Sequence, residues 1–395
     1  MPIQEKYDLV IIGGGCAGLS LASRLAEYGD KAPKTLIIEP RTSYTNDRTW
    51  CFWDTQQSEG KHIPNKSWNF FEIKYAGKSS VYDCQSAPYQ MLRSDQFYQT
   101  MLKTIAGNAN IQLRLGQKIS KNPRHIDHKW YLQLDHHLIS SKMIVDTRPA
   151  QDILEDDAVL WQSFLGIEVK LKKNVFDPEK LVLMDFDENF TQGLGFVYVL
   201  PSSKNRALIE YTVFSKNRLF EQDLAPYLEN ALSKYLGENN FEVTHQEHGI
   251  LPMGNKFIPD QRQESYLRAG LYAGAARPSS GYAFQRIQSW AQQCAESLVL
   301  QSKLKAQPDF SLLMPPQTNI VCFRYLAKLE GEALNQHQTN IRQQLVESGL
   351  FHITQAKIDG AIWLRVTLMN PFTVENDLDA LLASIAQTSK NLLSE

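Results

Sequence analysis

Near its N-terminus the chain reads Tyr7-Asp8-Leu9-Val10-Ile11-Ile12-Gly13-Gly14-Gly15-Cys16-Ala17-Gly18. An apolar, β-branched run ends here in Gly-x-Gly-x-x-Gly, and apolar residues at helical spacing follow. In such a strand–loop–helix unit, Gly13, Gly15 and Gly18 allow a tight turn, close approach of the backbone to a pyrophosphate, and close helix–strand packing. The helix N-terminus adds unpaired N–H groups and a partial positive charge. The stretch therefore predicts a Rossmann-like dinucleotide site.

A second apolar run supports this prediction. Thr35-Leu36-Ile37-Ile38 ends in Glu39, about 20 residues beyond the glycines, where a carboxylate can hold a ribose hydroxyl. The glycines alone would also fit an ordinary βα turn. The order strand, loop, helix, strand, acid is much more specific to a dinucleotide fold.

Composition excludes several other classes of function. The 395 residues contain 41 Lys and Arg against 43 Asp and Glu, so no net charge favours nucleic acid. The five cysteines are scattered without metal-ligand spacing, which predicts free thiols in a reducing cytosol and no metal site. The early first strand leaves no room for a signal peptide, and no apolar run approaches the roughly 18 residues of a membrane span. Peripheral membrane contact stays open.

Alternating strand and helix signals predict an α/β fold with an inserted sheet. We expect a dinucleotide-binding domain at residues 1–154 and 256–301, interrupted by an antiparallel-sheet substrate domain at 155–255. Polar residues ending in Pro308 predict a linker at 302–312. A small α+β module is expected at 313–395.

The expected module has the order β-α-β-β-α and is large enough to fold alone. Its strands are predicted at 319–325, 352–358 and 361–368, with a helix at 335–348 and a hairpin turn at Asp359-Gly360. After a break at Asn370-Pro371, Thr373 is expected to cap the last helix. The buried face of that helix is predicted to contain Leu378, Leu381, Leu382 and Ile385.

The motifs after Glu39 resemble a known family. Asp47-Arg48-Thr49-Trp50 opens an aromatic-rich block that fits either a buried core turn or the wall of an apolar cavity. Further motifs follow at 92–97, 146–149, 164–166, 175–178, 183–186, 196–201, 207–212 and 274–284. Together, in this order, they make roughly the first 300 residues similar to flavin-dependent bacterial lycopene β-cyclases. The resemblance implies FAD as cofactor and a doubly wound fold of the two-dinucleotide-binding-domain flavoprotein type.

The resemblance also implies cofactor contacts beyond the glycine loop and Glu39. Arg48 belongs to the aromatic block, and Arg93, on a predicted helix with Phe97 one turn on, matches a cofactor-contacting position of similar flavoproteins. Pattern alone would make Arg93 a solvated surface residue. In the last motif, Gly274, Ser280 and Gly281 form a loop before a second helix, whose N-terminus can stabilise negative charge on a flavin.

Glu210 is the candidate catalytic acid. It lies in a predicted strand, on one face with Leu208 and Thr212 and opposite Ile209 and Tyr211. A carboxylate on a buried sheet needs a partner or a raised pKa. The residues alone favour a structural salt bridge, whereas the resemblance aligns Glu210 with the acid on which the cyclases depend.

The activity implied is the net redox-neutral closure of lycopene ψ-ends to β-ionone rings. The family's reaction is acid-initiated, with reduced FAD stabilising the carbocation and NAD(P)H as reductant, in a cytoplasmic protein on the inner face of the membrane. One alternative is a flavin-dependent monooxygenase or prenyl reductase acting on an apolar substrate. Another is a non-catalytic or impaired fusion or chimera.

The chimera alternative rests on the C-terminal part of the chain. Residues 311–390 resemble the small C-terminal domain of pyridoxal-phosphate-dependent amino-acid decarboxylases, through motifs at 319–325, 349–351, 357–360 and 364–371. The large domain that carries the cofactor lysine is absent, so no PLP is expected. A fragment of this kind predicts homo-oligomerisation through the module, or its docking onto the flavin domain.

Overall fold

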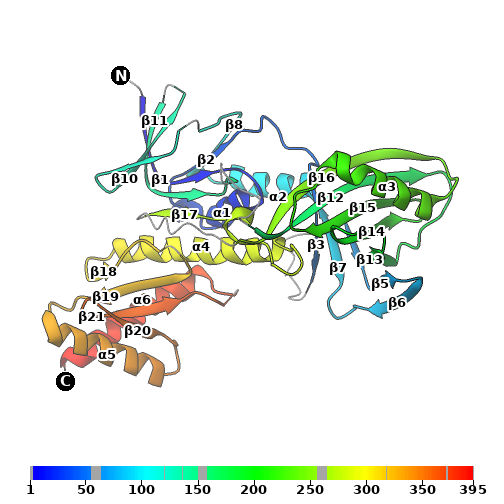
Figure 1. Cartoon of the computed structure of the whole chain (residues 1–395). Helices are drawn as coiled ribbons and strands as arrows, with labels where there is room; N and C mark the ends of the chain where they lie inside the picture. Colours follow the sequence, from blue (N-terminus) through cyan, green and yellow to red (C-terminus); the bar gives the residue numbers. More distant parts are fainter. Residues whose placement is uncertain are drawn as a thin grey trace.

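A computed structural model describes residues 3–54, 64–119, 121–135, 137–149, 158–255, 265–316, 318–370 and 372–394. The predicted domain boundaries at 154/155 and 255/256 lie in or beside segments outside these residues, as does Pro371. Figure 1 shows the first sheet at the upper left, a second sheet to the right, and the C-terminal module below the long helix α4.

The first sheet has the strand order β8-β2-β1-β11-β10-β9, with β17 also paired to β11. Its parallel strands are β1 (Ile3–Ile12), β2 (Thr35–Glu39), β8 (Ile111–Leu115), β11 (His137–Asp146) and β17 (Tyr266–Arg268). The antiparallel strands β9 (Arg124–Ile126) and β10 (Lys129–Leu134) extend it at one edge. This mixed sheet is the core of a Rossmann-like domain.

Both faces of β1 are buried, which explains its unbroken apolar sequence. Leu9 and Ile11 pack against helices α1 (Cys16–Ala26), α2 (Ser94–Ala106) and α4 (Phe284–Lys305). Val10 and Ile12 pack on the opposite face with Trp130 of β10. Short 3-10 turns occupy Gly29–Lys31 (η1) and Leu271–Ala273 (η3).

The second sheet has the order β16-β12-β15-β14-β13-β5-β6. Its members are β12 (Ala158–Leu171), β13 (Lys180–Asp187), β14 (Gly193–Ser203), β15 (Arg206–Ser215), β16 (Phe241–Asn255), β5 (Phe70–Tyr75) and β6 (Lys78–Asp83). All described pairings are antiparallel except β13 with β5. The sheet therefore includes a hairpin from the N-terminal part of the chain, outside the expected range 155–255. Helix α3 (Glu221–Leu236) covers one face of this sheet.

The aromatic block joins the two large sheets. It forms β3 (Thr49–Trp53), which pairs with β7 (Tyr89–Arg93), and β7 pairs with β4 (Lys66–Trp68). Because side chains alternate along a strand, Trp50 and Phe52 pack into the core of the first sheet. Cys51 and Trp53 pack into the core beside the second sheet. One short strand therefore contacts the cores beside both sheets.

The C-terminal module has an antiparallel sheet of order β18-β19-β21-β20. Its elements are β18 (Phe310–Leu312), β19 (Ile320–Tyr325), α5 (Gly331–Glu347), β20 (Thr354–Ile358), β21 (Ala361–Thr367) and α6 (Glu375–Ser394). The hairpin turn is as expected, with φ of 50° at Asp359 and 77° at Gly360. The core of the module contains the predicted face of α6.

Three local predictions for this region are wrong. Residues 302–312 are no linker, because α4 continues to Lys305 and β18 joins the sheet. The core of the module also extends beyond the expected range 313–395, since Val299, Leu300 and Leu304 of α4 belong to it. Thr373 does not cap α6: its hydroxyl donates to the Asn370 carbonyl at 2.9 Å. At the start of α6, the Asp377 carboxylate accepts instead from the Val374 N–H at 2.8 Å.

Candidate active site

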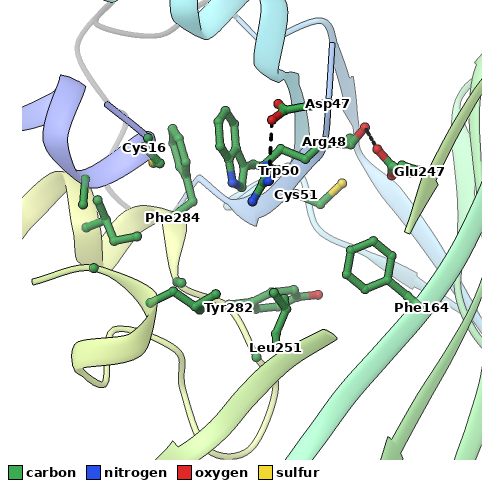
Figure 2. A pocket seen from close by; sticks show the side chains of 18 of the residues that line it. Cys16, Asp47, Arg48, Trp50, Cys51, Phe164, Glu247, Leu251, Tyr282 and Phe284 are labelled. Carbon is green, nitrogen blue, oxygen red and sulfur yellow. Dashed lines mark hydrogen bonds and ion pairs between the residues drawn. The ribbon is translucent and has the colours of Figure 1, made fainter. Parts of the chain in front are cut away.

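A cavity of about 480 Å³ runs from the glycine loop to the second sheet. Figure 2 shows it between Cys16 at the start of α1 and Phe164 and Glu247 on the second sheet. Gly13, Gly15, Glu39 and Glu210 all line this one space. The structure thus brings together the two halves of the site that the sequence predicts separately.

Each of the three motif glycines is favoured over other residues for a different local reason. Gly13 has φ of +101°, and a Cβ there would lie 2.5 Å from Thr147 Oγ1. A Cβ on Gly18 would lie 2.0 Å from the Gly13 carbonyl oxygen, so this glycine permits the close helix–strand contact. Beside Gly15 the space is open, since the nearest atom to a Cβ would be Arg41 Nη2 at 3.9 Å. The open position faces the cavity, where a phosphate-bearing ligand would approach the backbone.

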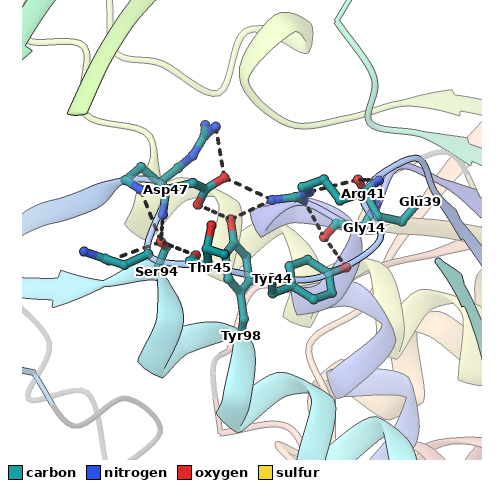
Figure 3. Close-up of polar contacts among 10 residues, drawn as sticks. Gly14, Glu39, Arg41, Tyr44, Thr45, Asp47, Ser94 and Tyr98 are labelled. Atoms are coloured by element: carbon teal, nitrogen blue, oxygen red, sulfur yellow. Dashed lines mark hydrogen bonds and ion pairs between the residues drawn. The ribbon is translucent and has the colours of Figure 1, made fainter. Parts of the chain in front are cut away.

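Glu39 is held rigidly beside the loop (Figure 3). Its Oε2 accepts from the Gly14 N–H at 2.6 Å. Its Oε1 accepts from the N–H and Nε–H of Arg41 at 2.9 and 2.8 Å. Burial alone would raise the pKa of Glu39, but the hydrogen bonds from Arg41 and Gly14 hold that pKa below its ordinary value. A fixed, ionised carboxylate is thus available at the position expected for ribose recognition.

Arg41 is a site residue that the motif reading does not identify. Its guanidinium also donates to the Gly14 carbonyl, the Tyr98 hydroxyl and the Asp47 carboxylate, each at 3.1 Å. Tyr44 donates to the same Gly14 carbonyl at 2.8 Å. These contacts tie the glycine loop to the segment that leads into the aromatic block (Figure 3). The available sequence signal was an arginine two residues after the acid that ends β2.

The remaining predicted cofactor residues separate into two groups. Arg48 and Gly281 line the cavity, but Gly274 and Ser280 are not among its lining residues. Arg93 is also outside the lining. It ends strand β7 rather than lying on a helix, and its guanidinium pairs with Asp95 at 3.2 Å and with Glu168 at 3.7 Å. Its expected flavin contact therefore has no support in the geometry.

Gly281 is favoured by its left-handed backbone conformation. It has φ of +72°, and a Cβ there would lie 1.9 Å from Gln162 Oε1 of the second sheet. The following residues, Ala283, Phe284 and Ile287, place the first turn of α4 against the cavity. The N-terminus of a second helix therefore faces the space beside the glycine loop, where its partial positive charge favours a negatively charged group.

The far end of the cavity is mainly apolar and aromatic. Its lining there includes Phe164, Leu200, Leu208 and Leu251, together with the tyrosines Tyr89, Tyr198 and Tyr282. The hydroxyls of Tyr89 and Tyr282 are 2.9 Å apart, and burial raises the pKa of both groups. These phenols therefore stay neutral at physiological pH, and their rings form an uncharged wall.

Glu210 projects into this apolar end. As predicted, Leu208 and Glu210 share the cavity face of β15, whereas Ile209 and Tyr211 pack under α3. Glu210 Oε1 accepts from the Thr212 hydroxyl at 2.7 Å. Burial, followed by the nearby Glu247 carboxylate, raises the pKa of Glu210 well above its ordinary value. A carboxyl in this setting holds its proton at neutral pH and can donate it to an apolar reactant.

Glu247 is a second site residue missed by the sequence reasoning. It lies on β16, is 4% exposed and lines the same cavity. His248 also lines the cavity, and His245 lies 3.6 Å from Glu247. No short motif links these residues to Glu210, because strand pairing brings them together.

Sequence comparisons identify relatives of this chain. The sequence model of the lycopene cyclase protein family matches residues 8–360. A lycopene beta-cyclase from Pantoea ananas is 22% identical over 295 residues, which cover 71% of this chain and 72% of that protein. A neoxanthin synthase from Solanum tuberosum is 24% identical over 331 residues, 75% of this chain and 61% of its own length.

Solved structures show the fold. A geranylgeranyl bacteriochlorophyll reductase-like protein from Thermoplasma acidophilum superposes with a TM-score of 0.58 at 14% identity, covering 77% of this chain and 79% of that one. A probable FAD-dependent monooxygenase from Pseudomonas aeruginosa gives 0.55 at 15% identity, covering 77% and 88%. The chain thus has a Rossmann-like flavoprotein fold.

The family match also bears on the tail. It continues to residue 360, through β20 and past the point near Leu300 where the recognised cyclase motifs end. The resemblance of residues 311–390 to decarboxylases stays a prediction. Since the matched region includes the glycine loop, Glu39 and Glu210, and covers most of the chain, this protein belongs to the lycopene cyclase family.

Proposed function

We propose that this protein is an FAD-dependent lycopene β-cyclase that closes ψ-end groups to β-ionone rings without net redox change. The observation that carries the proposal is the continuous cavity from the glycine loop to Glu210. At one end the backbone suits a dinucleotide, and at the other a carboxyl of raised pKa faces apolar side chains. A polyene end group needs this combination of an apolar site and a retained proton.

The residues that fit FAD are those around the open cradle at Gly15. Gly13 and Gly15 would hold the pyrophosphate, Glu39 the ribose, and Arg48 and Gly281 the parts nearer the second sheet. When bound in its reduced form, FAD supplies negative charge beside the cavity, which favours a nearby carbocation. The proposal includes NAD(P)H as the source of reducing equivalents.

Glu210 is the proposed acid. Its O–H bond breaks as the π electrons of the terminal alkene form a new C–H bond, and the electron pair of the O–H bond remains on the carboxylate. The neighbouring internal alkene then attacks the tertiary cation, and loss of a proton leaves the ring. Tyr198 and Tyr282 line the same space, and their rings can stabilise the cation by cation–π attraction. The apolar walls exclude the water that would otherwise capture it.

The proposed substrate dissolves in membranes, and we therefore place the protein on the cytoplasmic face of the inner membrane as a peripheral enzyme. Within the described residues, every helix is too short or too polar to cross a bilayer. Vesicle co-sedimentation would test this placement, and a protein that stays in the supernatant would contradict it.

Expression in lycopene-accumulating cells, with pigment analysis, tests the function. The wild type should convert lycopene to products of unchanged mass with one or two rings. Glu210→Gln should abolish conversion and retain flavin absorbance, because it removes the acidic proton and keeps the shape. The exposed Glu242→Gln, a matched loss of one carboxylate in the same sheet, should retain activity.

Other outcomes identify the alternatives. A product with changed mass and stoichiometric NAD(P)H consumption would indicate a monooxygenase or prenyl reductase. A colourless protein without flavin absorbance would indicate the non-catalytic or impaired fusion. An active Glu210→Gln variant would remove Glu210 from the acid role.

A further inference from the structure

The geometry points to a carboxyl dyad: we infer that Glu247 is a positioning residue that keeps the catalytic proton on Glu210, across Gly166. This inference rests on the proposed function for its chemical role. Its structural basis is independent of the substrate, because it depends on strand register and on the contacts of Glu247.

The register of the second sheet places the two acids on either side of one residue. Gly166 of β12 is the pairing partner of Glu210 on β15 and also of Glu247 on β16. Residues directly opposite each other share a face of a sheet. The two glutamates therefore point to the same side, about 10 Å apart at the backbone, two strand spacings. Their side chains are long enough to meet above the middle strand.

Gly166 makes the meeting possible. A Cβ at this position would lie 3.0 Å from Glu210 Cβ and 3.2 Å from Glu210 Cγ. The Glu210 side chain thus lies directly over the glycine, in space that any other residue would fill. Glu210 and Glu247 both line the cavity, and the neighbouring Glu247 raises the pKa of Glu210 in addition to burial.

The surroundings distinguish the two acids. Glu247 Oε2 accepts from the Thr49 hydroxyl at 2.9 Å and lies 3.6 Å from His245 Nε2. The neighbouring Glu247 carboxylate raises the pKa of His245, which favours a positively charged partner beside Glu247. Glu210 accepts from the neutral Thr212 hydroxyl at 2.7 Å and faces the apolar cavity. The shared proton accordingly belongs on Glu210.

The other titratable groups that face the dyad stay neutral or lie farther out. Burial raises the pKa values of Cys51 on β3 and of Tyr198 on β14, as it does for Tyr282. Two further charged residues affect the pKa of His245: Arg93 lowers it and Glu168 raises it. The titration of His245, which lies 3.6 Å from Glu247, has to be separated from that of Glu210.

The dyad also has a consequence for the cation. When Glu210 gives up its proton, two adjacent carboxylates remain beside the positive charge. Their mutual repulsion and their attraction to the cation favour return of a proton from the ring carbon, which restores the O–H bond. The acid is therefore regenerated without an external base.

The test is the pH dependence of cyclisation by the flavin-loaded enzyme. Activity should fall as pH rises through the pKa of Glu210, because only the protonated form donates. In Glu247→Gln the negative neighbour is gone. The alkaline limb of the pH–activity profile, where activity falls as pH rises, should therefore move down by about one to two pH units. The control Glu242→Gln, an exposed position on the same strand, should leave the limb in place.

Infrared titration of the resting protein supplies a readout without turnover. The wild-type minus Glu210→Gln difference spectrum should show a protonated carboxyl at neutral pH. In the Glu247→Gln background this signal should disappear at lower pH. If the signal moves although lycopene is never cyclised, the dyad stands and the proposed function fails.

If lycopene is cyclised but neither limb nor signal moves in Glu247→Gln, the dyad is wrong and the function stands. His245→Gln should retain an alkaline limb. Loss of the limb in that variant would assign it to His245 and overturn the inference.

Discussion

At the scale of single residues, the glycine loop makes a prediction that separates folding from binding. Gly18→Ala forces a Cβ to within 2.0 Å of a backbone oxygen. We expect it to lower the free energy of unfolding by about 3 kcal/mol or more. Gly15→Ala meets no atom closer than 3.9 Å, and Gly15 has an extended φ of −81°.

Gly15→Ala should therefore change stability by only about 1 kcal/mol, while its methyl group intrudes on the cradle and weakens flavin binding. Urea unfolding of the flavin-free proteins and fluorescence titration with FAD measure the two effects. Equal loss of stability in both variants would contradict the assignment of an open, ligand-facing position to Gly15.

Residues were predictable from the sequence where their role is local. Gly13, Gly15, Gly18 and Glu39 act through their own turn or strand end, so a motif shows them. Glu247 and its relation to Glu210 depend on how three strands align, and spacing along the chain contains no record of that register. An isolated glycine in a strand, Gly166, was the one available signal of a close approach.

At the scale of elements, an ion-pair cluster connects α4 to α6. Lys303 Nζ lies 2.6 Å from both Glu375 Oε1 and Asp379 Oδ1, and its side chain is 13% exposed. Lys303→Met should reduce stability at pH 7 by about 1–2 kcal/mol, because it removes charge-assisted hydrogen bonds. Lys390→Met, an exposed substitution on α6, is the matched control.

The effect should depend on pH in a defined direction. The hydrogen bond from Lys303 lowers the pKa of Glu375 below its ordinary value of 4.5. The stabilisation is therefore present above that value and is lost as pH falls through the lowered folded-state pKa. Denaturant unfolding from pH 7 to pH 3 should show the Lys303→Met difference shrinking. A constant difference would indicate lost packing rather than lost charge.

Helices and strands were predictable where turn residues or the regular spacing of apolar residues determines them. The Asp359-Gly360 hairpin and the apolar face of α6 are confirmed. The linker at 302–312 was wrong because polar residues at the end of a long helix resemble a loop. The transfer of β5 and β6 to the second sheet could not be read from local pattern, since β6 is exposed along its whole length.

At the scale of the whole molecule, α4 takes part in two cores. Ala291, Cys294, Ala295 and Leu298 pack with the first sheet, and the next turns supply Val299, Leu300 and Leu304 to the C-terminal module. The length of the C-terminal module alone predicted that the module can fold by itself. The shared helix instead couples the module to the domain that carries the glycine loop.

This coupling predicts how fragments behave. Residues 306–395 alone lack three core side chains and should show no cooperative thermal transition, whereas residues 284–395, which retain α4, should gain one. In the full chain, Leu300→Ala empties a fully buried position of the module and should cost about 2–5 kcal/mol. Because α4 spans both cores, flavin release and loss of helical circular dichroism should shift together in this variant. Release of flavin at the wild-type temperature, with only the module melting early, would show that the two cores unfold independently.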